Sequence, residues 1–303
     1  MNVLLCGDLS ANERSEWLSA LAGAMPEARW LDLAAAHATP AAPASVQAAI
    51  VANPAPGCLQ GLPALRLIQS LWAGVDRLLA DTTLPAGVPI ARMVDPLMNA
   101  AMAETALWAV LSLHRGFFAY AERQRRREWR VHAQRRAEEV RVLVLGQGQM
   151  GRAAASRIAQ QGYVLSTWRR DGSALAPLLG QADIVVNLLP LTDGTRGLLD
   201  RHFFAALPPA ASVVNLGRGA HVVDADLLAA LDSGQMSHAV LDVFPIEPLP
   251  VTHAFWQHPR VTLLPHAAAV TDARSAAAMA VANLRACRDG APVQNLVDRR
   301  RGY

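Results

Sequence analysis

The sequence predicts an α/β protein with two doubly wound domains, each built on a parallel sheet. Three observations predict this. The chain has 303 residues, 52% of them hydrophobic, which is enough for two packed cores. Short apolar runs alternate with helical patterns, and this alternation is typical of parallel sheets. A glycine-rich turn, "GQGQMG" at 146–151, lies between a strand pattern and a helix pattern.

The first hundred residues carry four strand patterns and one clear helix start. Ser10 and Glu13 have the spacing of a capping box, so we expect a helix to begin there. Proline and glycine predict loops at 38–45 and 53–57. The strands are expected at 2–7, 48–52, 65–71 and 89–93.

A long, mostly buried helix is expected at 97–118, and a second alternating run begins at Val140. The last helix pattern covers 272–288. Between them we expect strands at 140–145, 163–168, 183–189, 212–217, 238–243 and 261–264, and helices at 149–161 and 224–233.

Composition excludes several kinds of chemistry. All 28 basic residues are arginine, so neither a Schiff base on lysine, nor a P-loop lysine, nor a Tyr-Lys dehydrogenase pair can form. Cys6, Cys58 and Cys287 are scattered and odd in number, which predicts a reducing compartment and neither a metal motif nor a redox pair. We find no signal-peptide pattern and no apolar run long enough to span a bilayer, so we expect a cytoplasmic protein without a membrane partner.

Much of the excess of basic over acidic residues lies in one segment. Net charge is only +3, but "RQRRREWRVHAQRR" at 123–136 is rich in arginine. Such a run can bind nucleic acid or anionic lipid. We prefer to interpret it as a solvated helix face or an interdomain connection, and we expect no nucleic-acid partner.

The turn at 146–151 has the pattern and setting of a dinucleotide site. Gly146 permits a tight turn, Gly148 lets the backbone approach a pyrophosphate, and Gly151 allows close packing of helix and strand. Gln149 and Met150 begin the helix, whose positive end would face the pyrophosphate.

The strand that follows ends in Arg169 and Arg170 rather than in a carboxylate. A carboxylate there binds the ribose hydroxyls, whereas guanidinium groups suit a 2′-phosphate. The first acid, Asp171, belongs to a "DG" turn pattern. The sequence therefore predicts NADPH as the preferred cofactor. The alternative is that one or both arginines are solvated and that NADH is also accepted.

Three later residues follow predicted strands, at the sheet edge where a nicotinamide would lie: Arg218, Glu247 and His266. Each alone has a structural explanation. Together they suit reduction of a 2-keto acid. Histidine donates a proton near neutral pH, a nearby carboxylate favours the imidazolium, and arginine binds a carboxylate and polarises a keto oxygen.

These motifs carry a resemblance. The glycine turn, "LPLTDGTRGLL", "NLGRG", "LDVF" followed by "EPLP", "WQHPRVTLLPH" and "VDRRRGY" are similar to the D-2-hydroxyacid dehydrogenase family, and within it to the glyoxylate/hydroxypyruvate reductase A branch. The resemblance covers essentially the whole chain. It implies a Rossmann cofactor domain at 97–273 and a flavodoxin-like substrate domain at 1–96 and 274–303, with substrate bound in the cleft between them.

The resemblance also implies roles for particular residues. Arg218 would bind substrate, His266 would be the proton donor, and Glu247 would be its partner. Further positions would contact the cofactor or the substrate. For the cofactor these are Leu189, Pro190, Leu216 and Asp242, the last near the carboxamide. For the substrate they are Trp72, as a possible pocket wall, and the backbone N–H groups of Ala73 and Gly74, in "LWAGVD".

The implied reaction is NADPH-dependent reduction of glyoxylate or hydroxypyruvate to glycolate or D-glycerate, by a homodimer whose interface lies near 97–118 and the basic segment. Two departures concern the site: Ala268 and Ala269 stand where the family often has a small hydroxyl residue, and Trp72 departs from the branch's loop pattern.

Three alternatives stay open. The first is a dehydrogenase of this fold for another substrate, such as phosphoglycerate, a bulkier keto acid or phosphite. The second is a nucleotide-sensing binding protein similar to the family's transcriptional corepressors. The third is an enzyme weakened by the missing hydroxyl. A formate dehydrogenase is disfavoured, because resemblance to that branch would imply a Gln–His pair, and this chain has Glu247 in place of the glutamine.

Overall fold

The protein was studied as a computed structural model, which describes residues 1–36 and 43–303. The chain forms two compact α/β units, one comprising Met1–Leu97 and Thr271–Tyr303 and the other Met98–Val270. The predicted division, after residues 96 and 273, lies one and three residues away from these boundaries. The predicted loop at 38–45 falls mostly on residues outside those described.

The first unit is built on a five-stranded parallel sheet with the order β2-β1-β3-β4-β5. This is a flavodoxin-like order, as predicted. The sheet is buried on both faces, so its strands are almost continuously apolar, as in Val46–Ala52. Strand β2 was not predicted, because only three residues form it. The elements are β1 (Asn2–Gly7), α1 (Ala11–Ala24), β2 (Arg29–Leu31), α2 (Leu33–Ala36), η1 (Pro43–Ser45), β3 (Val46–Ala52), β4 (Leu67–Ser70), α3 (Asp76–Leu79), β5 (Ile90–Ala91) and α10 (Ala273–Asp289).

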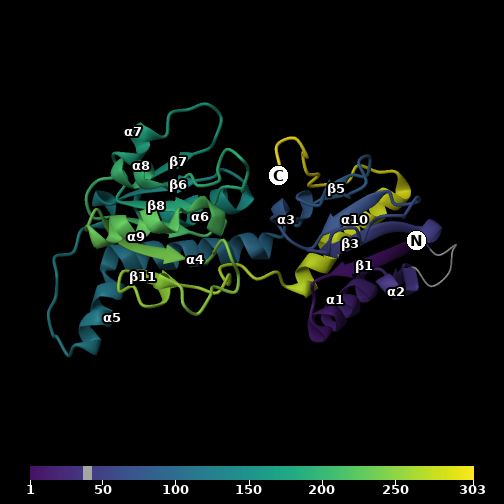
Figure 1. Ribbon diagram of the computed structural model, residues 1–303, viewed down its shortest axis with the longest axis horizontal. Coiled ribbons are helices and arrows are strands. Elements are labelled where there is room, and N and C mark those ends of the chain that lie inside the picture. Colours follow the sequence, from purple (N-terminus) through teal and green to yellow (C-terminus); the bar gives the residue numbers. More distant parts are fainter. Residues whose placement is uncertain (37–42) are drawn as a thin grey trace. The chain divides into compact units, whose positions relative to one another are not determined.

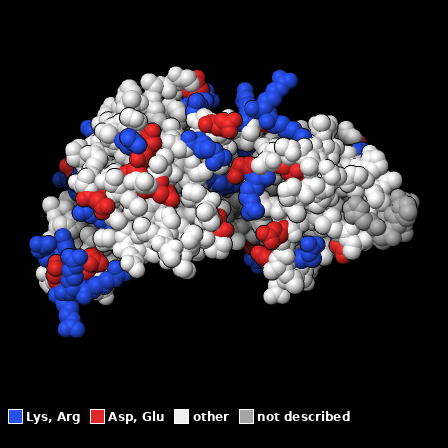
Figure 2. Space-filling view, viewed as in Figure 1, with Lys and Arg blue, Asp and Glu red and all other residues white. Residues whose placement is uncertain are grey.

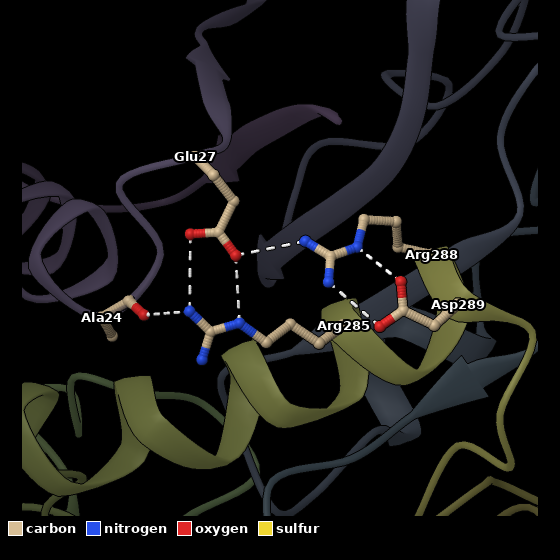
Figure 3. A network of polar contacts seen from close by, with 5 residues as sticks. All are labelled: Ala24, Glu27, Arg285, Arg288 and Asp289. Carbon is tan, nitrogen blue, oxygen red and sulfur yellow. Dashed lines mark hydrogen bonds and ion pairs between the residues drawn. The ribbon is translucent and has the colours of Figure 1, made fainter.

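Helix α10 belongs to the first unit although it follows the second in the chain. Its buried Asn283 donates from Nδ2 to Oε1 of Gln69 on β4, at 2.8 Å. Near its end, Arg285 and Arg288 both bind the Glu27 carboxylate, which follows α1 (Figure 3). Exposed ion pairs of this kind stabilise little individually. The helix is also attached by the buried amide pair and by its buried apolar residues, among them Ala280, Val281 and Leu284.

Two cysteines of the first unit are neighbours. The Sγ atoms of Cys6 on β1 and Cys58 in the β3–β4 connection lie 3.7 Å apart as free thiols. The two thiols are neighbours because the loop returns to β1 across 52 residues of sequence, a proximity that their spacing in the sequence does not show. The distance is longer than a disulfide bond, which is about 2.05 Å.

The second unit contains a six-stranded parallel sheet in the order β11-β10-β9-β8-β6-β7, with helices along its faces (Figure 1). The order reverses between β6 and β8, and ligands of such sheets bind at the carboxyl ends of strands at that switch point. The elements are α4 (Pro96–Arg115), α5 (Phe117–Arg125), η2 (Ala137–Glu139), β6 (Arg141–Leu145), α6 (Gln149–Ala159), β7 (Val164–Trp168), α7 (Ala176–Leu179), β8 (Ile184–Asn187), α8 (Arg201–Ala205), β9 (Ala211–Asn215), η3 (Gly219–His221), α9 (Asp224–Asp232), β10 (Met236–Leu241), η4 (Ala254–Trp256) and β11 (Val261–Leu263).

The helix expected at 97–118 is interrupted. Gly116 has a φ of +69°, so α4 ends before it and α5 begins after it. A Cβ at this glycine would lie 2.2 Å from the His132 ring. The break thus comes from a left-handed turn and from close packing of the returning chain, two features that helical periodicity does not report.

The basic segment is part helix and part irregular chain. It begins in the last turn of α5 and continues without regular structure to 136. Basic side chains gather around the end of α5, at the lower left of Figure 2, whereas Arg135 pairs with Asp183, just before β8. Trp129 in this segment is fully exposed. Across the described ranges, no helix is long and apolar enough to cross a membrane.

Candidate active site

The glycine turn joins β6 to α6 and is shaped by two of its glycines. Gly146 has a φ of +110°, and a Cβ there would lie 2.6 Å from the Leu188 carbonyl oxygen. A Cβ on Gly151 would lie 2.0 Å from the Gly146 oxygen. Gly148, by contrast, is exposed, with open space where its side chain would be. The turn therefore leaves room for a ligand at the first residue before α6, where Gln149 and the half-buried Met150 follow.

The two arginines after β7 differ in their surroundings. Arg169 donates from Nε to Oδ2 of Asp171 at 2.6 Å, and this bond, with Ser173, lowers the Asp171 pKa to about 2. The Arg170 guanidinium lies against Gly194, where a Cβ would be 2.5 Å from its Cζ. The prediction of a 2′-phosphate site gave both arginines the same role. Their surroundings differ, because only Arg169 has an internal carboxylate partner in the described part of the chain.

Leu189 and Leu216 follow β8 and β9, but their side chains are buried in hydrophobic clusters. Only their backbone groups are therefore available to a ligand. Pro190 is half-buried. Of these three predicted cofactor contacts, Pro190 is the one whose side chain is accessible.

A buried polar network supports these loops, and sequence reasoning missed it. Asn187 Nδ2 donates to Asn215 Oδ1 and to His221 Nδ1, each at 2.9 Å, and Asn215 Nδ2 donates to the Arg218 carbonyl at 3.0 Å. Because His221 Nδ1 accepts, its Nε2 carries the proton, 3.3 Å from the Pro190 oxygen. An asparagine at the end of two successive apolar strands was the available signal.

His266 and Glu247 form a direct pair. His266 Nδ1 lies 2.8 Å from Glu247 Oε2, and Glu247 Oε1 accepts the Phe244 N–H at 2.8 Å. The histidine side chain is 51% exposed, so its Nε2 side remains accessible. The carboxylate thus fixes the ring and leaves Nε2 as the atom that can exchange a proton.

The pair shifts the acidity of both members. The hydrogen bond that His266 Nδ1 donates to Glu247 raises the pKa of His266, against the opposing effect of burial and of the Arg218 charge. Burial would raise the pKa of Glu247, but the bonds to His266 and to the Phe244 N–H outweigh it and the pKa falls. The arrangement favours an imidazolium beside a carboxylate near neutral pH.

Asp242 holds the backbone around His266. Its carboxylate accepts the N–H groups of Ala267 at 2.7 Å and Ala268 at 3.1 Å, and its carbonyl accepts the His266 N–H at 2.8 Å. Burial raises the pKa of the Asp242 carboxyl group. Because the side chain is 1% exposed, its observed role is to position the histidine loop, where His266 has a φ of +54°.

No hydroxyl follows the histidine at 268 or 269, but one reaches the loop from α4. Thr105 Oγ1 donates to the Ala268 carbonyl at 2.8 Å. This contact is separated by 163 residues in sequence and carried no recognisable signal. It anchors the loop, and does not replace the family's hydroxyl as a donor to a ligand.

Arg218 follows β9 on the same sheet edge. It is half-buried, and its Nη1 donates to the Gly217 carbonyl at 2.8 Å. Its charge is close enough to lower the pKa values of both His266 and Glu247. The second unit therefore brings together the three predicted catalytic residues. In the part of the chain described, no group of three or more metal-ligating side chains could hold a metal ion.

The predicted substrate loop lies in the first unit, directly after β4. Trp72, Ala73 and Gly74 are half-buried. The Trp72 N–H donates to Ser70 Oγ at 3.0 Å. The Ala73 and Gly74 N–H groups have no acceptor among residues 1–36 and 43–303. Two backbone donors are therefore available to a ligand at this edge of the first sheet.

The second unit has the features of a nucleotide-dependent oxidoreductase. Its turn after β6 fits a dinucleotide, and a histidine–carboxylate pair with an arginine lies on the same edge of the same sheet. Comparison with known proteins makes this class specific.

The model of the D-isomer specific 2-hydroxyacid dehydrogenase NAD binding domain matches residues 107–268. A glyoxylate/hydroxypyruvate reductase A of Serratia proteamaculans is 36% identical over 305 residues, covering 95% of this chain and 96% of that protein. The chain therefore belongs to the D-isomer specific 2-hydroxyacid dehydrogenase family, and it is an NAD(P)-dependent oxidoreductase.

Two solved structures are similar over the whole chain. A D-isomer specific 2-hydroxyacid dehydrogenase of Xanthobacter autotrophicus, in complex with NADPH and MES, has a TM-score of 0.92 and 37% identity, covering 99% of each chain. An NADPH-dependent glyoxylate/hydroxypyruvate reductase of Sinorhizobium meliloti, in complex with NADP and sulfate, has a TM-score of 0.89 and 33% identity, covering 100% of this chain and 99% of the other. The predicted fold class and family are thus confirmed.

Proposed function

We propose that this protein reduces glyoxylate or hydroxypyruvate to glycolate or D-glycerate with NADPH, and that His266 donates the proton. The observation that carries the proposal is the 2.8 Å contact between His266 Nδ1 and Glu247 Oε2, beside Arg218. The relatives named glyoxylate/hydroxypyruvate reductase A, at 35–36% identity over most of the chain, support the substrate assignment.

The cofactor is NADPH, in keeping with the NADPH and NADP complexes of the similar structures. Gly146 and Gly151 shape the turn that would receive its pyrophosphate, and the open space at Gly148 fits that group. Arg170, with Arg169, would bind the 2′-phosphate. When bound, the cofactor supplies the hydride for the keto carbon.

The protein's own groups would prepare the substrate and transfer the proton. Arg218 would bind the substrate's oxygens and polarise the keto group. The Ala73 and Gly74 N–H groups would bind the carboxylate. His266, held by Glu247, would give its Nε2 proton to the keto oxygen as negative charge develops there.

The test is the change in absorbance at 340 nm with purified protein. NADPH or NADH is combined in turn with glyoxylate, hydroxypyruvate, pyruvate, phosphohydroxypyruvate and phosphite plus the oxidised cofactor. We expect fast NADPH oxidation with the first two keto acids and slower oxidation with NADH. Tight NADPH binding without turnover of either keto acid would contradict the proposal and would favour another substrate or a nucleotide-sensing role.

We also propose a homodimer that uses α4, α5 and the basic segment. Large apolar side chains are exposed along these elements of the second unit, with Trp108 41%, Phe117 54%, Trp129 102% and Val131 83% exposed. Burying such a surface favours association. Light scattering after size exclusion should give twice the 32.4 kDa chain mass, and a monomer would contradict the proposal. Substituting Trp129→Ser should shift the equilibrium toward the monomer.

A further inference from the structure

Arg92, the first residue after β5, is half-buried, and its side chain has no partner among the described residues. Its backbone N–H donates to the Asn295 carbonyl at 3.0 Å. Its guanidinium makes no hydrogen bond or ion pair with any residue that the structure describes. Burial lowers the pKa of this group, and no carboxylate in the described ranges offsets the effect. Partial removal of a cation from water without compensation is unfavourable, so the position is one where a ligand could supply the missing charge.

The position of Arg92 in the sheet brings it beside the substrate loop. Strands β4 and β5 are parallel neighbours, and both end at the same edge. The residue after Arg92, Met93, donates its N–H to the Trp72 carbonyl at 3.1 Å. Arg92 therefore lies in a segment that is hydrogen-bonded to the loop containing Ala73 and Gly74. All of these residues lie within the first unit.

The donors on this edge define the chemistry of their ligand. The Ala73 and Gly74 N–H groups have no acceptor among the described residues, and Arg92, whose neighbour Met93 is hydrogen-bonded to the same loop, carries a permanently charged guanidinium. Backbone N–H groups with an arginine suit a carboxylate, which accepts several hydrogen bonds and neutralises the cation. A neutral carbonyl compound would leave the half-buried charge without compensation.

We propose that Arg92 is a substrate-binding residue that, with the Ala73 and Gly74 N–H groups, binds the carboxylate of the 2-keto acid and thereby selects acids over neutral carbonyl compounds. The identity of that acid rests on the proposed function. Alternatively, Arg92 would bind a second anionic group of the substrate, and the comparison of ligands with one and two carboxylates distinguishes these roles.

The first experiment measures steady-state kinetics with NADPH and glyoxylate for Arg92→Gln and Arg92→Lys. Loss of a charge-assisted contact made in both ground and transition states should raise KM by roughly 10- to 100-fold, with kcat changed much less. Lysine keeps the charge but lacks the planar fork, so Arg92→Lys should lie between wild type and Arg92→Gln. The matched control is Arg77→Gln, which removes the same charge from an exposed side chain three residues after Gly74, and it should leave KM near the wild-type value.

The second experiment measures ligand binding without turnover, by calorimetry on the full-length protein with NADPH. Oxamate carries one carboxylate and tartronate carries two. Arg92→Gln should weaken both by a similar factor, because both present the carboxylate that the loop would bind. A loss confined to tartronate, unchanged binding of both, or an equal effect of Arg77→Gln would overturn the proposal.

The two experiments also separate this inference from the proposed function. Wild-type protein that fails to reduce glyoxylate or hydroxypyruvate but binds oxamate in an Arg92-dependent way would refute the proposed substrates and support the anion site. Thermal unfolding is the check on folding. Because Arg92 has no internal partner among the described residues, Arg92→Gln should keep or slightly raise Tm, so a loss of binding would not reflect unfolding.

Discussion

The histidine loop around His266 in the second unit and the substrate loop around Trp72 in the first differ in how their polar groups are paired. Both follow a parallel strand at its carboxyl end. Around His266, the polar groups are paired within the protein: the ring with Glu247, and the backbone with Asp242. Around Trp72, the N–H groups of Ala73 and Gly74 have no acceptor in the described ranges.

The difference follows from what each loop would have to do. A proton donor must hold one orientation and one protonation state, and internal hydrogen bonds to a carboxylate provide both. An anion site must keep its donors available, because a donor already bonded to the protein offers a ligand little. In these two loops, internal pairing thus accompanies a side chain held in one orientation, whereas N–H groups without an acceptor accompany a proposed ligand site.

The largest expected effect is that of His266→Ala. Removing the proposed general acid should lower kcat by roughly 10²- to 10⁴-fold, because no other side chain of this loop can donate a proton. Stopped-flow or steady-state absorbance at 340 nm measures the loss, and fluorescence titration with NADPH serves as the control. Near-normal turnover would show that the imidazole pairs with Glu247 for structure alone.

A smaller effect is expected at the two arginines after β7. They differ in the same way as the two loops, because only Arg169 pairs with a carboxylate among the described residues. Arg170→Ala should raise Kd for NADPH by roughly 10- to 100-fold, because it removes charge-assisted bonds to the 2′-phosphate. Arg169→Ala should have the lesser effect, since its guanidinium already binds Asp171 at 2.6 Å. The double variant should approach equal affinity for NADPH and NADH.

Fluorescence titrations with both cofactors measure these affinities. Asp171→Asn is the informative control, because it weakens the internal partner of Arg169 and should strengthen NADPH binding if that arginine can then turn to the phosphate. Equal weakening of NADPH and NADH in Arg170→Ala would refute the phosphate assignment.

Much of this arrangement was predictable because strand ends in a parallel sheet meet at one edge. Arg218, Glu247 and His266 follow three predicted strands, so their proximity could be expected from order alone. Contacts between segments that are far apart in the sequence and on different elements could not be predicted in this way. Thr105 reaches Ala268 across 163 residues, and His132 packs on Gly116. Arg92 was missed for another reason: the sequence shows a side chain's charge but not whether a partner lies nearby.

The smallest expected effect on kcat is that of Glu247→Gln, which should chiefly change how the rate depends on pH. The glutamate raises the pKa of His266, chiefly through the hydrogen bond to Nδ1. In the proposed mechanism reduction needs the protonated ring, so activity should be present below this pKa and be lost as pH rises through it. Glutamine can retain a hydrogen bond but not the charge. The pKa should therefore fall, and the alkaline limb of the kcat/KM profile should move to lower pH. At acidic pH, where the ring stays protonated in both proteins, the loss in kcat should be about tenfold or less. A large loss that is uniform across pH would mean that the glutamate mainly orients the ring, and an unchanged limb would separate the titration of His266 from the rate.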